Sequence, residues 1–228
     1  MPTTDMPWLG QRLREERLKR GISLRGLARS VGVSASMISQ IETTKSQPSV
    51  STLYAITNAL GVSIEDLFAV PNGQDRDADG DALEPTPARR LAEAEGAPTT
   101  VIQALGSSRG GQLGPLVRPS ERQVLNLDSG VRWELLGKLP HHAVDFLLIT
   151  YAPGGTSSST GGLMRHPGSE YGFLLSGELV LTLGFDTKRL HAGDSVSFDS
   201  ATPHGYHNEG SAPAVGVWFV LEQEPAPG

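Results

Sequence analysis

The sequence contains no cysteine, which excludes disulfide bonds and thiolate metal sites. It also lacks any apolar run approaching the roughly 18 residues that a membrane span requires. The N-terminal stretch MPTTDMPWLGQRLREERLKR has no apolar segment of the kind found in secretion signals. We therefore expect a soluble, cytoplasmic protein without membrane contact, in which any metal ion would be held by histidine and carboxylate side chains.

Charge is unevenly distributed along the 228 residues. The first 70 residues carry eight Lys and Arg against six Asp and Glu, a charge of +2, whereas the remainder carries eleven against nineteen, a charge of −8. A chain of this length can form two domains, each with its own core. We predict two domains with different tasks, of which the first is able to approach nucleic acid.

The first 70 residues are divided by three Gly-x-Ser triplets, at residues 21–23, 32–34 and 61–63. Glycine can close a helix in the left-handed conformation, and serine can cap the N-terminus of the next helix. Between the triplets, apolar residues recur with helical spacing, as in Leu24, Leu27 and Ala28. The pattern predicts short amphipathic helices, two of them joined by the tight turn 32–34 as in a helix-turn-helix motif.

The helix expected after this turn carries a stripe of uncharged polar side chains. An ordinary solvated helix face is usually rich in Lys and Glu. Short uncharged side chains suit the edges of base pairs better, and glutamine can make a bidentate contact to adenine. With basic side chains nearby to contact phosphates, we predict a set of DNA-binding residues: Arg25, Ser34, Ser36, Ser39, Gln40, Thr43 and Lys45.

The segment LREERLKRGISLRGLARSVGVSASMISQIETTKSQPSVSTLYAITNALGVSIEDLF resembles the phage-repressor-type helix-turn-helix domain of the XRE family. Six positions follow the family pattern: Ala28, Gly32, Ile38, Glu42, Pro48 and Ser49. The resemblance implies a five-helix, lambda-repressor-like DNA-binding domain over residues 8–70, with a recognition helix from Ser34 to Glu42. Thr44 departs from the usual Gly or Asn, and its β-branched side chain disfavours a left-handed cap at that helix end.

The rest of the chain divides into a linker and a β-rich region. Residues 71–114 are rich in Asp, Ala, Gly and Pro with few apolar residues, which predicts an acidic linker. From residue 115 to 222, short runs such as VDFLLITY and AVGVWFVLE are separated by turn residues, which favours an antiparallel barrel over βαβ units. The predicted fold class is therefore α+β, with a helical domain and an antiparallel β-barrel.

Three polar residues in the β-rich half are candidates for one site. His166 and Glu170 lie where one strand begins, and His204 lies in ATPHGYHN near another. Two imidazoles and a carboxylate suit a divalent Zn, Fe, Mn or Ni ion and leave open coordination positions. The same residues can instead orient a small organic effector by hydrogen bonds, or form a buried polar network that only stabilises the fold.

This half resembles the cupin superfamily. Its two motifs are matched by His166, Glu170 and Gly177, and by Gly193, His204 and Asn208. Met164 stands where the family places its first histidine, and a thioether is a poor ligand for these ions. Met164 thus argues against a complete four-ligand metal site, and we expect it at the pocket rim together with Arg165 and Tyr206.

An XRE-type domain followed by a cupin is the domain order of a group of bacterial transcriptional regulators, which the chain resembles over nearly its whole length. The resemblance implies a homodimer on a two-fold, double-stranded DNA operator, with a small-molecule effector in each cupin sensor. One recognition helix reads too few base pairs for specificity, which independently favours two copies. The alternative is a cupin metalloenzyme, a dioxygenase or isomerase, fused to a DNA-binding head. Since only three of the four usual ligands are present, we predict a regulator without catalytic residues.

Overall fold

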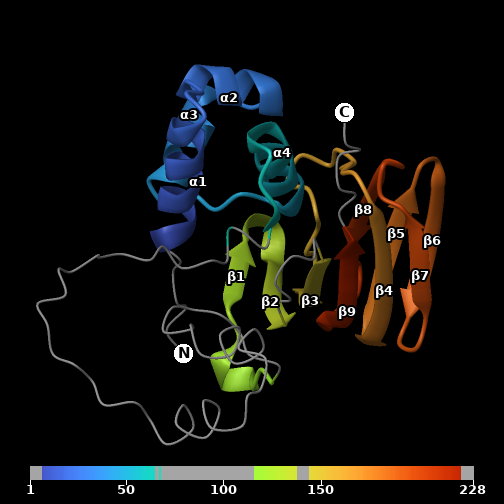
Figure 1. Cartoon of the computed structure of the whole chain (residues 1–228). Helices are drawn as coiled ribbons and strands as arrows, with labels where there is room; N and C mark the ends of the chain where they lie inside the picture. Colours follow the sequence, from blue (N-terminus) through green and yellow to red (C-terminus); the bar gives the residue numbers. More distant parts are fainter. Residues whose placement is uncertain (1–6, 65–66, 68–115, 138–143, 222–228) are drawn as a thin grey trace, which may run out of the picture.

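The computed structural model describes residues 7–64, 67, 116–137 and 144–221. These residues form a helical domain followed by a domain of antiparallel strands, which confirms the predicted fold class (Figure 1). The predicted linker, 71–114, lies outside the described residues. Within the described part of the chain, no helix has the length and apolar character needed to cross a membrane.

The helical domain contains α1 (Pro7–Lys19), α2 (Leu24–Val31), α3 (Ala35–Glu42) and α4 (Val50–Leu60). The last three helices each begin after a serine whose side chain accepts a hydrogen bond from an N–H in the first turn: Ser23, Ser34 and Ser49. Gly32 and Gly61 close α2 and α4 in the left-handed conformation. At the position of the fifth expected helix, Ile64 and Leu67 are helical and buried, and its remaining residues are not described.

Thr44 follows α3 with a φ of 56°, although a β-branched residue disfavours this left-handed conformation. Backbone hydrogen bonds hold it there: Lys45 N–H donates to Gln40 O at 2.8 Å, and Thr44 N–H donates to Ile41 O at 3.0 Å. The helix therefore ends as it would with the family's usual glycine or asparagine, at some cost in backbone strain.

A buried ion pair joins α1 to α3. The Arg17 guanidinium donates from Nε and Nη2 to the two carboxylate oxygens of Glu42, at 2.6 and 2.8 Å, and from Nη1 to Ile22 O at 2.9 Å. The hydrogen bonds to Glu42 raise the pKa of the Arg17 guanidinium, and this effect exceeds the lowering caused by burial. This bidentate pair fixes the recognition helix against the first helix.

The β-domain has two antiparallel sheets. The larger one has the strand order β1-β2-β3-β9-β4-β7, and the smaller one has the order β6-β5-β8. The bounds are β1 Val124–Leu127, β2 Val131–Gly137, β3 Val144–Tyr151, β4 Ser169–Ser176, β5 Glu178–Leu183, β6 Asp186–His191, β7 Ser195–Asp199, β8 His204–His207 and β9 Ala214–Leu221. Alternate residues of β3 and β9 are buried between the sheets, including Trp218.

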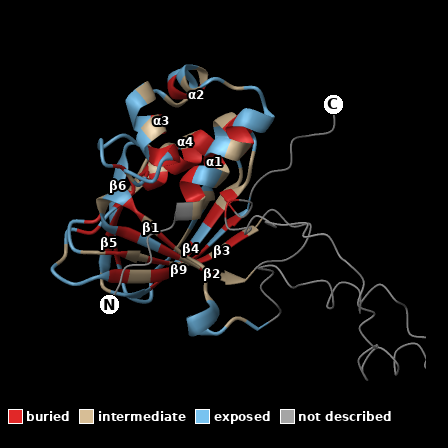
Figure 2. Cartoon of the chain, turned by 90° about the vertical axis from the view of Figure 1, so that its left-hand side faces the viewer, coloured by how far each residue is buried: buried red, intermediate tan, exposed pale blue. Residues whose placement is uncertain are grey.

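The two domains contact each other directly through α4, which lies over the ends of β1 and β2 in Figure 1. Ser51 N–H at the start of α4 donates to Ser157 O, and Asp128 N–H donates to Pro48 O, both at 2.9 Å. The Tyr54 ring meets Trp133 of β2 edge to face at 5.8 Å. Figure 2 shows buried residues in α4 and along the strands, whereas exposed residues gather on the outer sides of α2 and α3.

Candidate functional site

The DNA-reading stripe predicted for the recognition helix lies on the solvent-facing side of α3. Ser36 and Gln40 are exposed and Ser39 is half-buried. Two of the predicted residues also have local structural roles: the Ser34 hydroxyl accepts from Met37 N–H, and Thr43 Oγ1 donates to Ser39 O at 2.7 Å. Two further predicted residues are exposed: Arg25 of α2 and Lys45, which follows α3.

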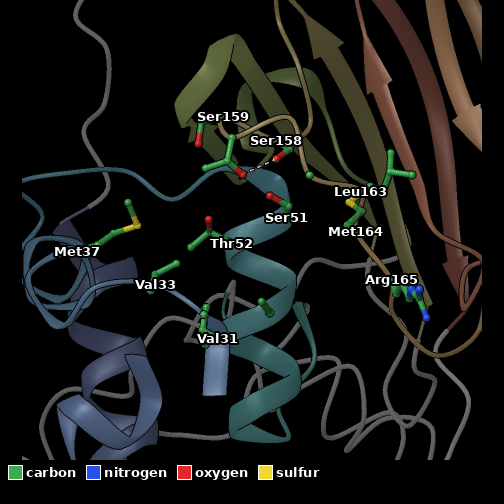
Figure 3. Close-up of a pocket in the computed structure, with 14 residues that line it drawn as sticks. Val31, Val33, Met37, Ser51, Thr52, Ser158, Ser159, Leu163, Met164 and Arg165 are labelled. Atoms are coloured by element: carbon green, nitrogen blue, oxygen red, sulfur yellow. Dashed lines mark hydrogen bonds between the residues drawn. The ribbon is translucent and has the colours of Figure 1, made fainter. Parts of the chain in front are cut away.

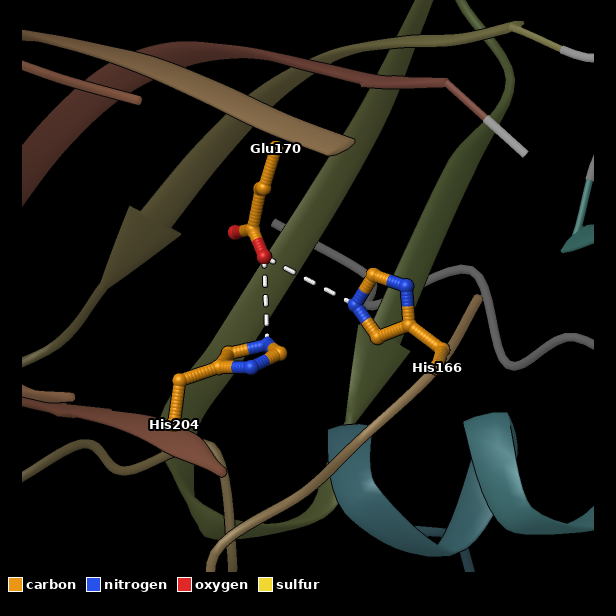
Figure 4. A group of neighbouring side chains, drawn as sticks. All are labelled: His166, Glu170 and His204. Carbon is orange, nitrogen blue, oxygen red and sulfur yellow. Dashed lines mark ion pairs between the residues drawn. The ribbon is translucent and has the colours of Figure 1, made fainter. Parts of the chain in front are cut away.

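His166, Glu170 and His204 come together between the two sheets of the β-domain (Figure 4). Glu170 Oε2 lies 3.1 Å from His204 Nε2 and 3.6 Å from His166 Nε2. Glu170 projects inward from the start of β4 and His204 from the start of β8, while His166 N–H donates to Ser200 O and thereby holds its loop against the barrel. The three side chains are 2, 5 and 0% exposed, so this site is closed to bulk solvent.

The facing atoms of this triad have unmet hydrogen-bonding capacity. His204 Nδ1 lies 2.8 Å from Thr202 O, and because a carbonyl only accepts, Nδ1 must carry the proton. Its Nε2 therefore presents a lone pair toward Glu170 unless a second proton is bound. His166 Nε2, His204 Nε2 and Glu170 Oε2 have no hydrogen-bond partner among the residues that the structure describes. Two imidazole nitrogens and a carboxylate oxygen aimed at one point fit a divalent cation.

Electrostatics also favour positive charge at this point. Burial by itself raises the pKa of Glu170, but the two histidines outweigh it and lower the pKa to about 2. For His204, burial lowers the pKa, but the close contact with the Glu170 carboxylate, the charge of that carboxylate and the hydrogen bond to Thr202 together raise the pKa more, so the net shift is upward. The carboxylate thus stays ionised and attracts either a proton on His204 or a bound cation.

Tyr206 was expected at the pocket rim, and the structure corrects this. Its side chain is 3% exposed, and its hydroxyl donates to Glu170 Oε1 at 3.1 Å. The reason is strand alternation, which turns residues two apart on β8 to the same inner face. Burial and the Glu170 charge raise the pKa of Tyr206, so its hydroxyl remains a donor.

A residue that sequence reasoning missed supports Tyr206 from behind. Trp218 Nε1 donates to the Tyr206 hydroxyl at 3.2 Å. Its indole fits because two strand positions lack a side chain: a Cβ at Gly172 would lie 2.7 Å from the ring, and one at Gly216 2.3 Å. The chain Trp218, Tyr206, Glu170 therefore fixes the carboxylate in the way that outer hydrogen bonds orient metal ligands.

Met164 and Arg165 line a pocket of about 300 Å³ between the domains (Figure 3). Met164 is 7% exposed, and its backbone exchanges two hydrogen bonds with His204. The other wall of the pocket belongs to the helical domain and includes Val31, Val33 and Met37. The residue that replaces the family's first histidine thus contributes to an interdomain pocket, beside which Arg165 is exposed.

The helical domain also reaches the triad itself, through a second residue that the sequence did not single out. The Tyr54 ring of α4 stacks on the His166 imidazole with a centroid distance of 4.2 Å and an interplanar angle of 5°. Tyr54 is 4% exposed. In the sequence, Tyr54 is one of several positions on the buried face of its helix, and it precedes His166 by 112 residues. No local pattern therefore predicts that the two rings stack.

Comparison with known proteins gives the same two-part description. Residues 13–67 match a helix-turn-helix family model and residues 147–220 match a cupin domain model. The chain is 28% identical over 201 residues to the HTH-type transcriptional regulator PuuR of Escherichia coli (strain K12), covering 87% of this chain and 86% of that protein. It is 24% identical over 206 residues to the HTH-type transcriptional regulator SutR of the same organism, covering 89% and 88%.

A solved structure extends the likeness to the three-dimensional level. The crystal structure of an HTH_3 family transcriptional regulator from Vibrio cholerae aligns with a TM-score of 0.58 over 96% of this chain and 97% of that one, at 21% identity, which shows a shared fold. In each of these comparisons the alignment extends over both domains of this chain. The chain therefore consists of a helix-turn-helix domain of XRE type followed by a cupin domain, and over most of its length it is similar to HTH-type transcriptional regulators.

Proposed function

We propose that this DNA-binding regulator works as a cytoplasmic homodimer whose operator affinity changes when a divalent cation occupies the triad of His166, Glu170 and His204. The observation that carries the proposal is the convergence of three buried, unpartnered ligand atoms on one point. A bound cation would supply the positive charge that satisfies the carboxylate and both imidazoles at once. Two histidines and a carboxylate suit Zn, Fe, Mn or Ni.

The closed geometry favours a sensor over the alternative of a cupin metalloenzyme. An enzyme must admit substrate to its metal, whereas His204 is fully buried and the Tyr54 ring covers His166. An ion fits this space, and a larger organic effector fits the adjoining pocket beside Met164 and Arg165 better than the triad. We therefore assign the triad to sensing and assign no catalytic residues.

The test is metal analysis joined to DNA binding on the full chain. Duplexes selected by the purified protein from bacterial genomic fragments serve as operator. We expect stoichiometric metal in the wild type, loss of metal in His166→Ala and His204→Ala, and an operator affinity that changes on chelation and returns on readdition of Zn²⁺. His191→Ala is the matched control, since this histidine is exposed and does not belong to the triad. Metal whose removal leaves operator affinity unmoved would refute the sensing role.

The DNA half of the proposal places base contacts on Ser36 and Gln40 and phosphate contacts on Arg25 and Lys45. Gln40→Ala is expected to weaken operator binding by about 1–3 kcal/mol and to relax sequence preference. Lys45→Ala is expected to weaken binding to all duplexes and to lower the salt dependence. If Gln40→Ala kept the sequence preference of the wild type, Gln40 would not contact the bases.

Homodimer formation is supported by an apolar patch on the outside of the larger sheet, across β3, β9 and β4. Strand register aligns Phe146, Phe219 and Tyr171 in one row across β3, β9 and β4. A second row aligns Leu148, Val217 and Phe173. Tyr171, Phe173 and Phe219 are 47, 45 and 41% exposed. Apolar side chains exposed on one sheet face can be buried against the same face of a second copy across a two-fold axis, as in homodimer interfaces.

Sedimentation velocity tests this face. Phe173→Glu and Phe219→Glu are expected to convert a dimer to monomers and to abolish cooperative operator binding. Phe185→Glu is the control, because Phe185 is fully exposed at the tip of the β5–β6 hairpin and lies outside the two rows. A dimer that persists in both sheet variants would place the interface elsewhere.

A further inference from the structure

We propose that Tyr54 of α4 is the positioning residue that couples the triad to the DNA-binding domain. The inference rests on the proposed sensing function and adds the route by which occupancy of the site reaches DNA. Its basis is the nearly parallel stack of Tyr54 on His166, 4.2 Å between ring centroids, across the boundary between the two domains. A residue of the reading domain is thus part of the wall of the sensor site.

The imidazole of His166 cannot reorient without affecting Tyr54. One neighbour of the ring is the parallel Tyr54, and another is His204, which meets it edge to face at 5.1 Å and 76°. The backbone of His166 is held to the barrel by its hydrogen bond to Ser200 O. Since both Tyr54 and His166 are 4% exposed, the rings move in a packed interior where small shifts are transmitted to their contacts.

The stack gains energy when His166 binds a cation, which is the differential interaction that coupling requires. The face of a tyrosine ring is electron-rich, and an imidazole that shares its lone pair with a cation becomes electron-poor. Tyr54 therefore attracts His166 more strongly in the occupied site than in the empty one. Cation–π contacts of this kind correspond to a change of roughly 2- to 30-fold in an equilibrium constant.

The position of α4 affects the position of the recognition helix. Tyr54 lies in the first half of α4, whose N-terminus is bonded to the β-domain through Ser51 and Pro48. The segment 43–49 joins α3 to α4 directly, and α4 packs against α2. On the other side, the α2–α3 turn is separated from the loop at Ser158–Arg165 by the interdomain pocket (Figure 3). Direct packing between the domains thus runs through α4, and a shift of α4 moves the reading face.

The experiment measures coupling in both directions on the full chain, with Zn²⁺ and a selected operator duplex as probes. Operator affinity is measured with and without Zn²⁺, and Zn²⁺ affinity, by competition with a chromophoric chelator, with and without operator. Linkage requires that the factor by which Zn²⁺ changes the operator affinity equals the factor by which operator changes the Zn²⁺ affinity. We call this common factor the coupling ratio. In wild type we expect a common ratio of roughly 2- to 30-fold. Tyr54→Phe keeps the aromatic face and is expected to keep the ratio.

Tyr54→Leu fills the space without an aromatic face. We expect this variant to bind Zn²⁺ and operator with a coupling ratio of one, so that neither ligand changes the affinity for the other. An unchanged cooperative melting transition identifies the variant as folded. A wild-type ratio in Tyr54→Leu would overturn the role of Tyr54. A ratio of one in the wild type itself would instead overturn the proposed sensing function, so the two failures are distinguishable.

Hydrogen exchange of the wild type gives a readout that does not depend on any variant folding. We expect Zn²⁺ to slow amide exchange in residues 50–60 of α4 as well as around the triad. Slowed exchange around the triad with unchanged exchange in α4 would contradict coupling through this helix.

Discussion

In the helical domain the buried carboxylate of Glu42 accepts two hydrogen bonds from Arg17, whereas in the β-domain Oε2 of the buried Glu170 faces two imidazole nitrogens without a hydrogen bond. Both carboxylates bear the desolvation cost of burial. The first is compensated entirely within the domain, which makes the ion pair part of the fold. The second is compensated by the hydrogen bond from Tyr206 and by the two imidazoles, whose facing nitrogens have no hydrogen-bond partner among the described residues and belong to the proposed cation site. The difference distinguishes a charge cluster that serves the fold from the cluster that we propose binds a cation.

The largest expected effect tests the structural side of this comparison. Glu42→Ala leaves the Arg17 guanidinium buried without its partner, and we expect a loss of about 3–5 kcal/mol in the free energy of unfolding. Urea denaturation of the helical transition measures it. A loss below about 1 kcal/mol, typical of exposed pairs, would contradict the structural role.

Glu170→Gln is the matching change in the β-domain, examined with chelator present. Its amide nitrogen can donate to His204 Nε2, while its oxygen still accepts from Tyr206, so we expect a change in unfolding free energy within about 1 kcal/mol. Zn²⁺ should stabilise the wild type but no longer this variant. A loss as large as that of Glu42→Ala would make the triad a structural network.

The next effect concerns the support of Glu170. Tyr206→Phe removes the hydrogen bond that orients the carboxylate while keeping the ring between its neighbours. We expect Zn²⁺ affinity to fall about 10- to 100-fold, the range seen when outer hydrogen bonds of metal ligands are removed. Chelator competition measures this change. Tyr171→Phe, on the outer face of β4, is the control and should leave the affinity unchanged.

The pH dependence of Zn²⁺ binding tests the effect of Glu170 on the pKa of His204. Although burial lowers the pKa of His204, Glu170 raises it more, so the net shift is upward, and at a pH below the shifted pKa a cation must displace a proton. Below that pKa, Zn²⁺ affinity should fall by up to about tenfold per pH unit, and above it the dependence on His204 should disappear. Calorimetry in buffers of different ionisation enthalpy reports the released proton. An affinity that does not fall as the pH drops through this range would contradict the shift.

The smallest effect lies in the helical domain, at a position without charge. Thr44 holds a φ of 56°, which asparagine or glycine adopts with less strain. Thr44→Asn is expected to raise the free energy of unfolding by about 0.5–1 kcal/mol, measured by thermal denaturation. Thr43→Asn, at a residue with φ −99°, should give no such gain.

Much of the architecture follows from short-range rules that a sequence displays. Gly32 and Ser34 mark the turn of the helix-turn-helix because a left-handed cap and an N-cap serine act within a few residues. His166, Glu170 and His204 were predicted together from motif spacing, and the structure brings them together. Strand alternation predicts that Tyr206, two residues after His204 on β8, points to the same inner face. The prediction of Tyr206 at the pocket rim did not take this alternation into account.

Local sequence patterns predict the two domains, the helix after the turn and the three residues of the triad, because caps, helical spacing and strand alternation depend on neighbouring residues. Three features became visible only in the folded chain: the triad is buried, Trp218 donates a hydrogen bond to Tyr206, and Tyr54 stacks on His166. These contacts arise from the packing of surfaces far apart in the chain. Sequence periodicity does not predict these contacts, since a buried tyrosine on a helix has the same local pattern whichever domain it faces.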